Sequence, residues 1–131
     1  MPKVTEMSSE KRDLLQTVMI VEDDVHIGAF LVEAITQETP YHAMLLSDGN
    51  EALRTIEHLK PSLLILDYHL PGINGLDLYD QIHSMPDLHE VPAIMMSARL
   101  PRRELEQRTI VGIHKPFELD DFLQTVKNLL E

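Results

Sequence analysis

The sequence predicts a three-layer α/β sandwich built on a five-stranded parallel sheet. Short apolar runs of strand length alternate along the chain with segments whose apolar residues have helical spacing. The runs at 19–21 and 63–66 contain no alternating polar residue, which is typical of strands covered on both faces. Because each strand is followed by a helix, we expect parallel strands joined by right-handed crossovers.

The elements follow one another in strict alternation. The strands are predicted at residues 17–21, 42–47, 63–66, 91–97 and 109–113. Amphipathic stripes predict four helices, and these stripes are Ile27, Phe30, Leu31, Ala34 and Ile35; Ala52, Leu53, Ile56 and Leu59; Leu78, Tyr79 and Ile82; and Leu119, Phe122, Leu123, Val126 and Leu130. The remaining segment, 100–108, has Pro101 near its start and only Leu100 and Leu105 to bury. We therefore expect the fourth of the five helices to be short and weakly held.

Length and composition limit the classes of protein to consider. A chain of 131 residues fits one domain, which we place at 17–131 after a flexible tail at 1–16. The absence of cysteine excludes disulfides and thiolate chemistry, and the net charge of −11 argues against direct contact with nucleic acid. Residues 1–16 are too polar for a signal peptide, and no apolar run is long enough to cross a bilayer. We expect a cytoplasmic protein without membrane contact.

Polar residues follow four of the five predicted strands. They are Glu22, Asp23 and Asp24 after the first strand, Asp67 after the third, Ser97 after the fourth and Lys115 after the fifth. Five strands of a doubly wound fold favour the flavodoxin-like order 2-1-3-4-5, in which strands one and three flank the point where ligands bind. Carboxylates gathered there repel one another unless a cation lies among them, so the pattern predicts a Mg²⁺ site.

Helix capping is the simpler explanation for an acid after a strand. It fits Asp24, which directly precedes the helix predicted from Val25. It does not fit Asp67, because the residues that follow include the turn sequence Leu70-Pro71-Gly72 rather than a helix. Asp67 is therefore a candidate for chemistry.

Other functions share parts of this pattern. An aspartate-nucleophile phosphotransferase or phosphatase typically has a second carboxylate two residues after the aspartate, where this chain has His69. A flavodoxin-type electron carrier needs a hydroxyl- and glycine-rich loop where the acidic run from Glu22 stands. A phosphorylation-independent scaffold of the same fold normally lacks Asp67, another of the acids or Lys115, and this chain has all of them. The seven histidines show no ligand spacing, so no histidine metal site is expected.

Four motifs carry a resemblance to a known family. They are Val21-Glu22-Asp23-Asp24, Asp67-Tyr68-His69-Leu70-Pro71-Gly72-Ile73-Asn74-Gly75, Ser97-Ala98 and Lys115-Pro116-Phe117. Together they resemble the response-regulator receiver domains of two-component phosphorelay signalling. The resemblance extends over residues 17–131 and implies a signalling domain rather than an enzyme, one that assists only its own phosphorylation and dephosphorylation.

The resemblance also implies a role for each site residue. Asp67 would accept a phosphoryl group from a histidine kinase or a histidine phosphotransfer protein. Asp23 and Asp67 would bind Mg²⁺, with Mn²⁺ as an alternative ion, while Glu22 would act through water and His69 through its backbone carbonyl.

Three further residues would serve the phosphoryl group itself. Ser97 would hydrogen-bond one of its oxygens, Lys115 would neutralise another, and Pro116 would shape the loop, commonly through a cis bond. This assignment agrees with the need of phosphoryl transfer for positioning and charge neutralisation.

The chain departs from the family pattern in the residues that usually report phosphorylation to a partner. Receivers usually carry an aromatic residue three positions before the lysine, where this chain has Gly112, and the interval from Ser97 to Lys115 is about one helical turn shorter than usual. The resemblance also implies that His69 and Arg99 occupy the positions that flank the path of attacking water. We expect both to slow hydrolysis of the acyl phosphate.

The fourth and fifth helices offer a surface for a homodimer. Basic residues cluster at Arg99, Arg102, Arg103 and Arg108, and acidic residues at Glu118, Asp120 and Asp121. Two copies related by a two-fold axis would bring each cluster against its complement, across the face made by helix four, strand five and helix five.

Overall fold

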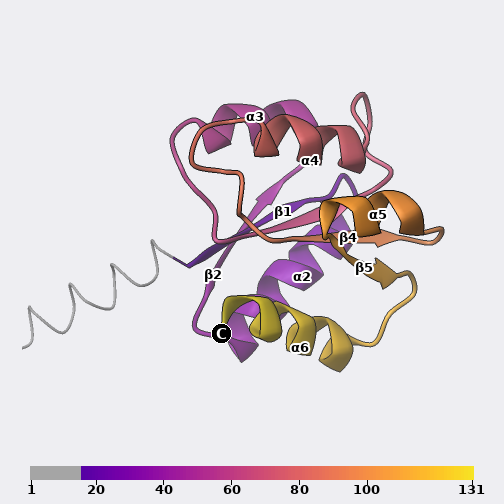
Figure 1. The fold of residues 1–131 in the computed structure, drawn as a ribbon. Coiled ribbons are helices and arrows are strands. Elements are labelled where there is room, and N and C mark those ends of the chain that lie inside the picture. Colours follow the sequence, from indigo (N-terminus) through magenta and orange to yellow (C-terminus); the bar gives the residue numbers. More distant parts are fainter. Residues whose placement is uncertain (1–15) are drawn as a thin grey trace, which may run out of the picture.

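The computed structural model describes residues 16–131, which form alternating strands and helices (Figure 1). The elements are β1 (Thr17–Val21), α2 (Val25–Glu38), β2 (His42–Leu46), α3 (Gly49–Ile56), β3 (Leu63–Asp67), α4 (Gly75–His83), β4 (Ala93–Ser97), α5 (Arg102–Arg108), β5 (Val111–His114) and α6 (Leu119–Leu130). The predicted tail at 1–16 lies outside the described residues except for Gln16. No helix within the described part combines the length and apolar character that a membrane crossing requires.

The strands form one parallel sheet in the order β2-β1-β3-β4-β5, which confirms the predicted fold. In this order β1 and β3 are neighbours, as the convergence of their acidic ends requires. Asp67 pairs with Met96, and Ser97 pairs with His114. The carboxyl ends of β3, β4 and β5 therefore reach the same edge of the sheet.

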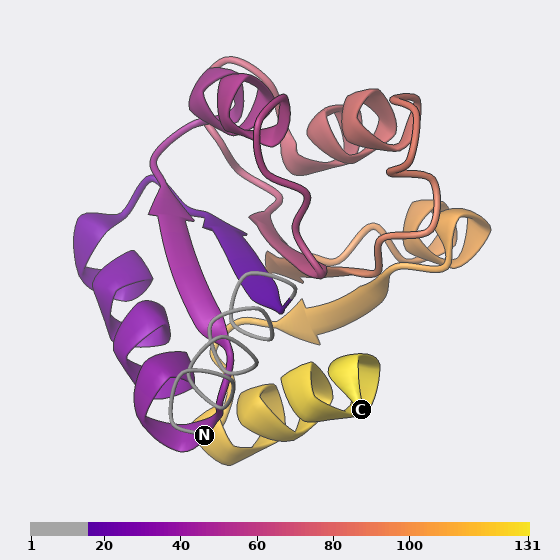
Figure 2. The same cartoon turned by 90° about the vertical axis from the view of Figure 1, so that its left-hand side faces the viewer.

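Helices cover both faces of the sheet, with α2 and α6 on one side and α3, α4 and α5 on the other (Figure 2). Alternate residues of each strand enter different cores. Met19 packs in the core that includes residues of α3, α4 and α5, whereas Val18 and Ile20 pack with α2 and α6. All three are fully buried, which explains why the strand sequences lack polar alternation.

The buried face of α2 differs from the predicted one. Gly28, Leu31 and Ile35 are buried, but the predicted core residues Ile27 and Phe30 are 37% and 53% exposed. The helix is apolar around much of its circumference, so its spacing did not reveal which row of side chains faces the sheet. The prediction was wrong for Ile27 and Phe30.

Two strands begin later than predicted. β4 starts at Ala93, because the preceding Pro92 has no amide hydrogen to donate and contributes only its carbonyl, to Leu64. β5 starts at Val111, because Thr109 ends α5 in the left-handed conformation at φ 59°.

The fourth predicted helix is short, as expected. α5 has seven residues, Leu105 is its only buried one, and its N-cap residue Pro101 provides no side-chain hydrogen bond. Leu105, near the middle of the helix, is therefore the one α5 residue that enters the core.

Candidate functional site

Three carboxylates converge where β1 and β3 end. Glu22 and Asp23 directly follow β1, and Asp67 is the last residue of β3. One oxygen from each lies within 4.8 Å of the others, and no other such group of three occurs in the described part of the chain. Glu22 and Asp67 are 2% and 6% exposed, while Asp23 is exposed. An oxygen-only donor set of this kind fits a hard divalent cation such as Mg²⁺.

The Lys115 side chain also reaches this cluster, from the end of the outermost strand β5. It directly follows β5, and its backbone N–H donates to the Ser97 carbonyl at 2.9 Å. Its Nζ lies 3.0 Å from Asp67 Oδ2 and 3.4 Å from Glu22 Oε1. Burial lowers the pKa of the Lys115 amine, but the two carboxylates outweigh burial and the net pKa is raised. Lys115 is thus a fixed cation beside Asp67, followed by the expected cis bond to Pro116.

Glu22 is a buried acid of the cluster with a raised pKa. Burial of its side chain, together with the neighbouring Asp67 carboxylate, raises its pKa to about 7. The Asp24 amide at 3.2 Å and the Lys115 amine oppose this shift without cancelling it. Asp24 itself caps α2 through the amides of His26 and Ile27, which confirms its predicted capping role.

The loop after β3 contacts the Asp67 carboxylate through a backbone amide. The His69 N–H donates to Asp67 Oδ1 at 3.1 Å, and the His69 side chain is exposed. Gly72 has a φ of +82°, a conformation that favours glycine. A Cβ on Gly75 would lie 2.6 Å from the Asp67 carbonyl oxygen, so glycine is needed for α4 to begin this close to β3.

Ser97 is buried at the end of β4, 1% exposed. Its Oγ donates to the Arg99 carbonyl at 2.9 Å and accepts from the Arg99 N–H at 3.0 Å. The hydroxyl is therefore engaged with the backbone that leads into α5. The Arg99 side chain is exposed.

Comparison of the chain with known proteins identifies the family to which it belongs. The family model of the response regulator receiver domain matches residues 18–127. The chain belongs to this family. The predicted resemblance is thereby confirmed.

Solved and curated relatives agree with the assignment. A putative response regulator from Chloroflexus aurantiacus is 28% identical with a TM-score of 0.78, over 88% of this chain and 98% of that one. The chemotaxis protein CheY4 of Vibrio cholerae has a TM-score of 0.81 at 21% identity, over 88% of this chain and 99% of that one, and supports the fold. The phosphate regulon transcriptional regulatory protein PhoB of Rhizobium meliloti is 28% identical over 121 residues, 89% of this chain and 53% of PhoB. The chain spans about half the length of the curated relatives it matches.

Gly112 packs against α5 and the segment before it. A Cβ on Gly112 would lie 2.9 Å from Leu105 Cδ1 and 3.1 Å from Leu100 Cδ1. Two leucines thus lie directly over the glycine that stands in place of the usual aromatic residue. Sequence reasoning missed this contact, because it identified both leucines only as weak core contributors.

One member of the predicted basic cluster is not free. Arg108 forms a two-bond ion pair with Asp80 of α4, so only Arg99, Arg102 and Arg103 remain exposed. This corrects the prediction that four arginines form one available surface. No periodic signal pointed to Asp80, which stands on the polar side of the α4 stripe.

Proposed function

We propose that this receiver is a phosphoacceptor switch. Asp67 takes a phosphoryl group from a histidine kinase or a histidine phosphotransfer protein, and the phosphorylated form changes its binding to a partner. The observation that carries the proposal is the position of Asp67, with Lys115 Nζ 3.0 Å from one of its oxygens and two further carboxylates beside it.

The residues around Asp67 match the demands of the transfer. One Asp67 oxygen forms a bond to phosphorus while the bond from phosphorus to the donor breaks, and the donor atom leaves with the electron pair. The Lys115 ammonium offsets charge on the transferred group, and the His69 N–H orients the carboxylate. A Mg²⁺ ion, or Mn²⁺, held by Glu22, Asp23, Asp67 and the His69 carbonyl would supply the remaining charge neutralisation.

The surface next to this site supports a protein donor. Val25 and Phe30 of α2 are 67% and 53% exposed, and α2 begins three residues after Glu22. Contact with a protein partner would remove this apolar surface from water, which favours association. The net charge of −11 disfavours nucleic acid as a direct partner of this chain.

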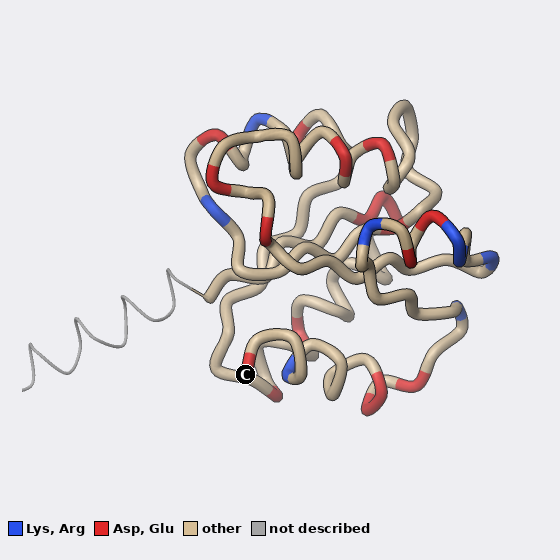
Figure 3. The backbone as a smooth tube through the Cα atoms, in the orientation of Figure 1, with Lys and Arg blue, Asp and Glu red and all other residues tan. Residues whose placement is uncertain are grey.

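A second copy of the chain is the further partner that we propose. Arg102 and Arg103 are exposed on α5, and Asp120 and Asp121 are exposed in the first turn of α6. The backbone trace in Figure 3 shows basic positions on α5 and acidic positions at the start of α6. A two-fold axis through the α5, β5 and α6 face would pair these opposite charges twice.

The phosphoacceptor assignment is tested by intact mass after incubation with acetyl phosphate or phosphoramidate and Mg²⁺. We expect the wild type to gain one phosphoryl group, and a chelator to suppress the gain. Asp67→Asn should gain none, because its amide is not a nucleophile of this kind. The matched control Asp77→Asn removes an exposed acid from α4 and should behave as the wild type. A phosphoryl group on Asp67→Asn, or full labelling with the chelator, would contradict the proposal.

A further inference from the structure

The loop after β3 connects Asp67, the proposed phosphoacceptor, to α4. Hydrogen bonds fix its two ends, where the His69 N–H donates to Asp67 Oδ1 at 3.1 Å and the Gly75 N–H donates to the Tyr68 carbonyl at 2.9 Å. In the described part of the chain, the backbone of residues 70–73 forms no hydrogen bond to a helix or strand. Side-chain packing therefore holds the middle of the loop in place.

Two side chains supply that packing. Leu70 is buried in the core on the α3 and α4 side of the sheet, and Ile73 packs against the same core. A Cβ on Gly49 would overlap the Ile73 Cγ2 methyl, whereas the next residue in reach, Leu78, would lie at an ordinary 3.7 Å. Because Ile73 is branched at Cβ, this methyl keeps a nearly fixed direction from the loop backbone. The methyl thus fills the space in which a side chain at position 49 would begin, and we call this contact the Gly49 socket.

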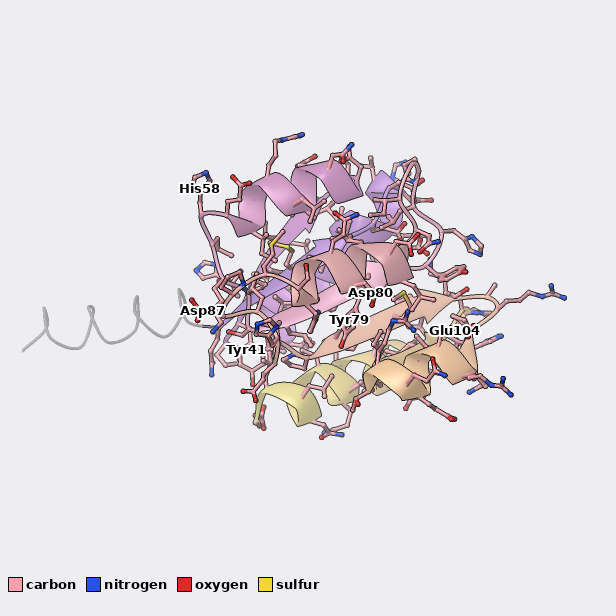
Figure 4. The ribbon with its side chains drawn as sticks, turned by 45° about the horizontal axis from the view of Figure 1, so that its top comes forward. Tyr41, His58, Tyr79, Asp80, Asp87 and Glu104 are labelled. Atoms are coloured by element: carbon pink, nitrogen blue, oxygen red, sulfur yellow. The ribbon has the colours of Figure 1, made fainter. Side chains whose placement is uncertain are left out.

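The socket lies where two connections of the acidic cluster meet. Gly49 is the first residue of α3, and Leu46, the last residue of β2, accepts the Glu22 N–H at 3.0 Å. In Figure 4, α3, which is followed by the labelled His58, lies beside α4, which carries the labelled Tyr79. The connection from β2 to α3 and the loop from β3 to α4 therefore touch at the socket, and each begins next to an acid of the cluster.

We propose that Ile73 is a positioning residue for the phosphoacceptor site, and that its Cγ2 methyl in the Gly49 socket sets the place of His69 relative to Asp67 and Glu22. The proposal rests on the proposed function, because it concerns the residues expected to hold the cation. The His69 N–H orients the Asp67 carboxylate, and the His69 carbonyl is the expected cation ligand. Both belong to one short backbone segment, so a displaced loop moves them together. Small displacements of this kind are costly at sites that depend on geometry.

Two substitutions of Ile73 separate positioning from burial of apolar area. Ile73→Leu keeps the number of carbon atoms but branches one carbon farther from the backbone, so it has no methyl to place in the socket. Ile73→Val removes only Cδ1 and keeps that methyl, which makes it the matched control. If apolar burial alone held the loop, Ile73→Val would be the more damaging change. If the socket positions the loop, Ile73→Leu is the more damaging one.

Gly49→Ala tests the other side of the socket. The added Cβ displaces the Ile73 methyl, while alanine is a better helix former than glycine at the start of α3. A loss of cation binding in this variant therefore does not come from a weaker helix.

Amide hydrogen exchange without metal measures how firmly the loop is held. In Ile73→Leu and in Gly49→Ala, we expect the His69 and Gly75 amides to exchange about three- to ten-fold faster than in the wild type. In Ile73→Val they should exchange at the wild-type rate. Wild-type rates in both Ile73→Leu and Gly49→Ala, or faster exchange in Ile73→Val than in Ile73→Leu, would overturn the proposal.

Calorimetric titration with Mg²⁺ extends the test to the site itself. We expect the affinity to fall about three- to ten-fold in Ile73→Leu and Gly49→Ala and to stay unchanged in Ile73→Val. Urea unfolding is measured alongside, because Ile73→Val should lose stability without losing affinity, whereas a merely structural role would lower both together. A wild type that binds Mg²⁺, with equal affinity in all variants, contradicts the positioning role alone. A wild type that binds no Mg²⁺ and gains no phosphoryl group contradicts the proposed function, and the positioning role with it.

Discussion

At Glu22, burial and cation binding act in opposite directions. The buried side chain has a pKa of about 7, so near neutral pH a large fraction of it carries a proton. A cation in the acidic cluster favours the ionised form and displaces that proton. We predict that Mg²⁺ affinity rises as the pH increases through about 7, the pKa of Glu22.

Calorimetry in two buffers of different ionisation enthalpy measures this linkage. Near neutral pH, Mg²⁺ binding to the wild type should release a fraction of a proton. Glu22→Gln should bind Mg²⁺ without that release, because its amide does not titrate. Equal proton release by both proteins would assign the linkage to another group.

The Arg99 backbone forms two hydrogen bonds with Ser97 Oγ, and the Arg99 side chain is exposed to solvent. A guanidinium at this position can pair with a phosphoryl oxygen and shield it from attacking water. We predict that Arg99→Ala shortens the lifetime of the acyl phosphate about three- to ten-fold, an effect of roughly 1 kcal/mol. Decay is followed by intact mass after removal of the donor. The acyl phosphate of the control Arg102→Ala, changed in the first turn of α5, should decay as that of the wild type does. An unaltered lifetime in Arg99→Ala would show that the Arg99 side chain is only a solvated charge.

At the scale of the elements, the ion pair between Arg108 and Asp80 joins α5 to α4. The hydrogen bond from Arg108 lowers the pKa of Asp80 below its usual value of 3.8. A carboxyl with a lower pKa in the folded state stabilises the fold above its unfolded value, and the stabilisation is lost as the pH falls through the folded value. Asp80 is 47% exposed, so the contribution near neutral pH is at most about 1 kcal/mol.

Urea unfolding of the wild type and of Asp80→Asn measures this contribution. The difference in free energy of unfolding should be largest near neutral pH and should vanish as the pH falls below about 4. Glu106→Gln, which alters an exposed acid on the same helix, should show little difference at any pH. A difference that persists in acid would show that packing, not ionisation, is the source.

At the scale of the whole molecule, the charge pattern of the α5, β5 and α6 face leads to a prediction on assembly. With Mg²⁺ and beryllofluoride, which mimics a phosphoryl group on aspartate, the sedimentation coefficient should shift toward that of a dimer, and added salt should reverse the shift because the paired charges are exposed. Arg102→Glu combined with Arg103→Glu should abolish it. Arg54→Glu on α3, away from this face, should not. If the dimer still formed after Arg102→Glu and Arg103→Glu, its interface would lie on another surface of the chain.

The sequence by itself determined the sheet and the location of the acidic cluster. Strands one and three have unbroken apolar character because both faces are covered, and Glu22, Asp23 and Asp67 follow them directly. Once the strands are parallel, their carboxyl ends share an edge, so residues far apart in the chain must meet there. Local pattern and topology were sufficient for this part.

Only the tertiary structure decided which side chains cover which surfaces. Phe30 belongs to an apolar stripe yet is exposed, because the packing of α2 on the sheet favours the neighbouring row. Arg108 and Asp80 are 28 residues apart, and their pairing depends on how α4 and α5 lie against each other. Leu100 lies over Gly112 for the same reason. Periodicity records the faces of one helix and contains no information on its neighbours, so the ion pair between Arg108 and Asp80 became visible only when both helices were in place.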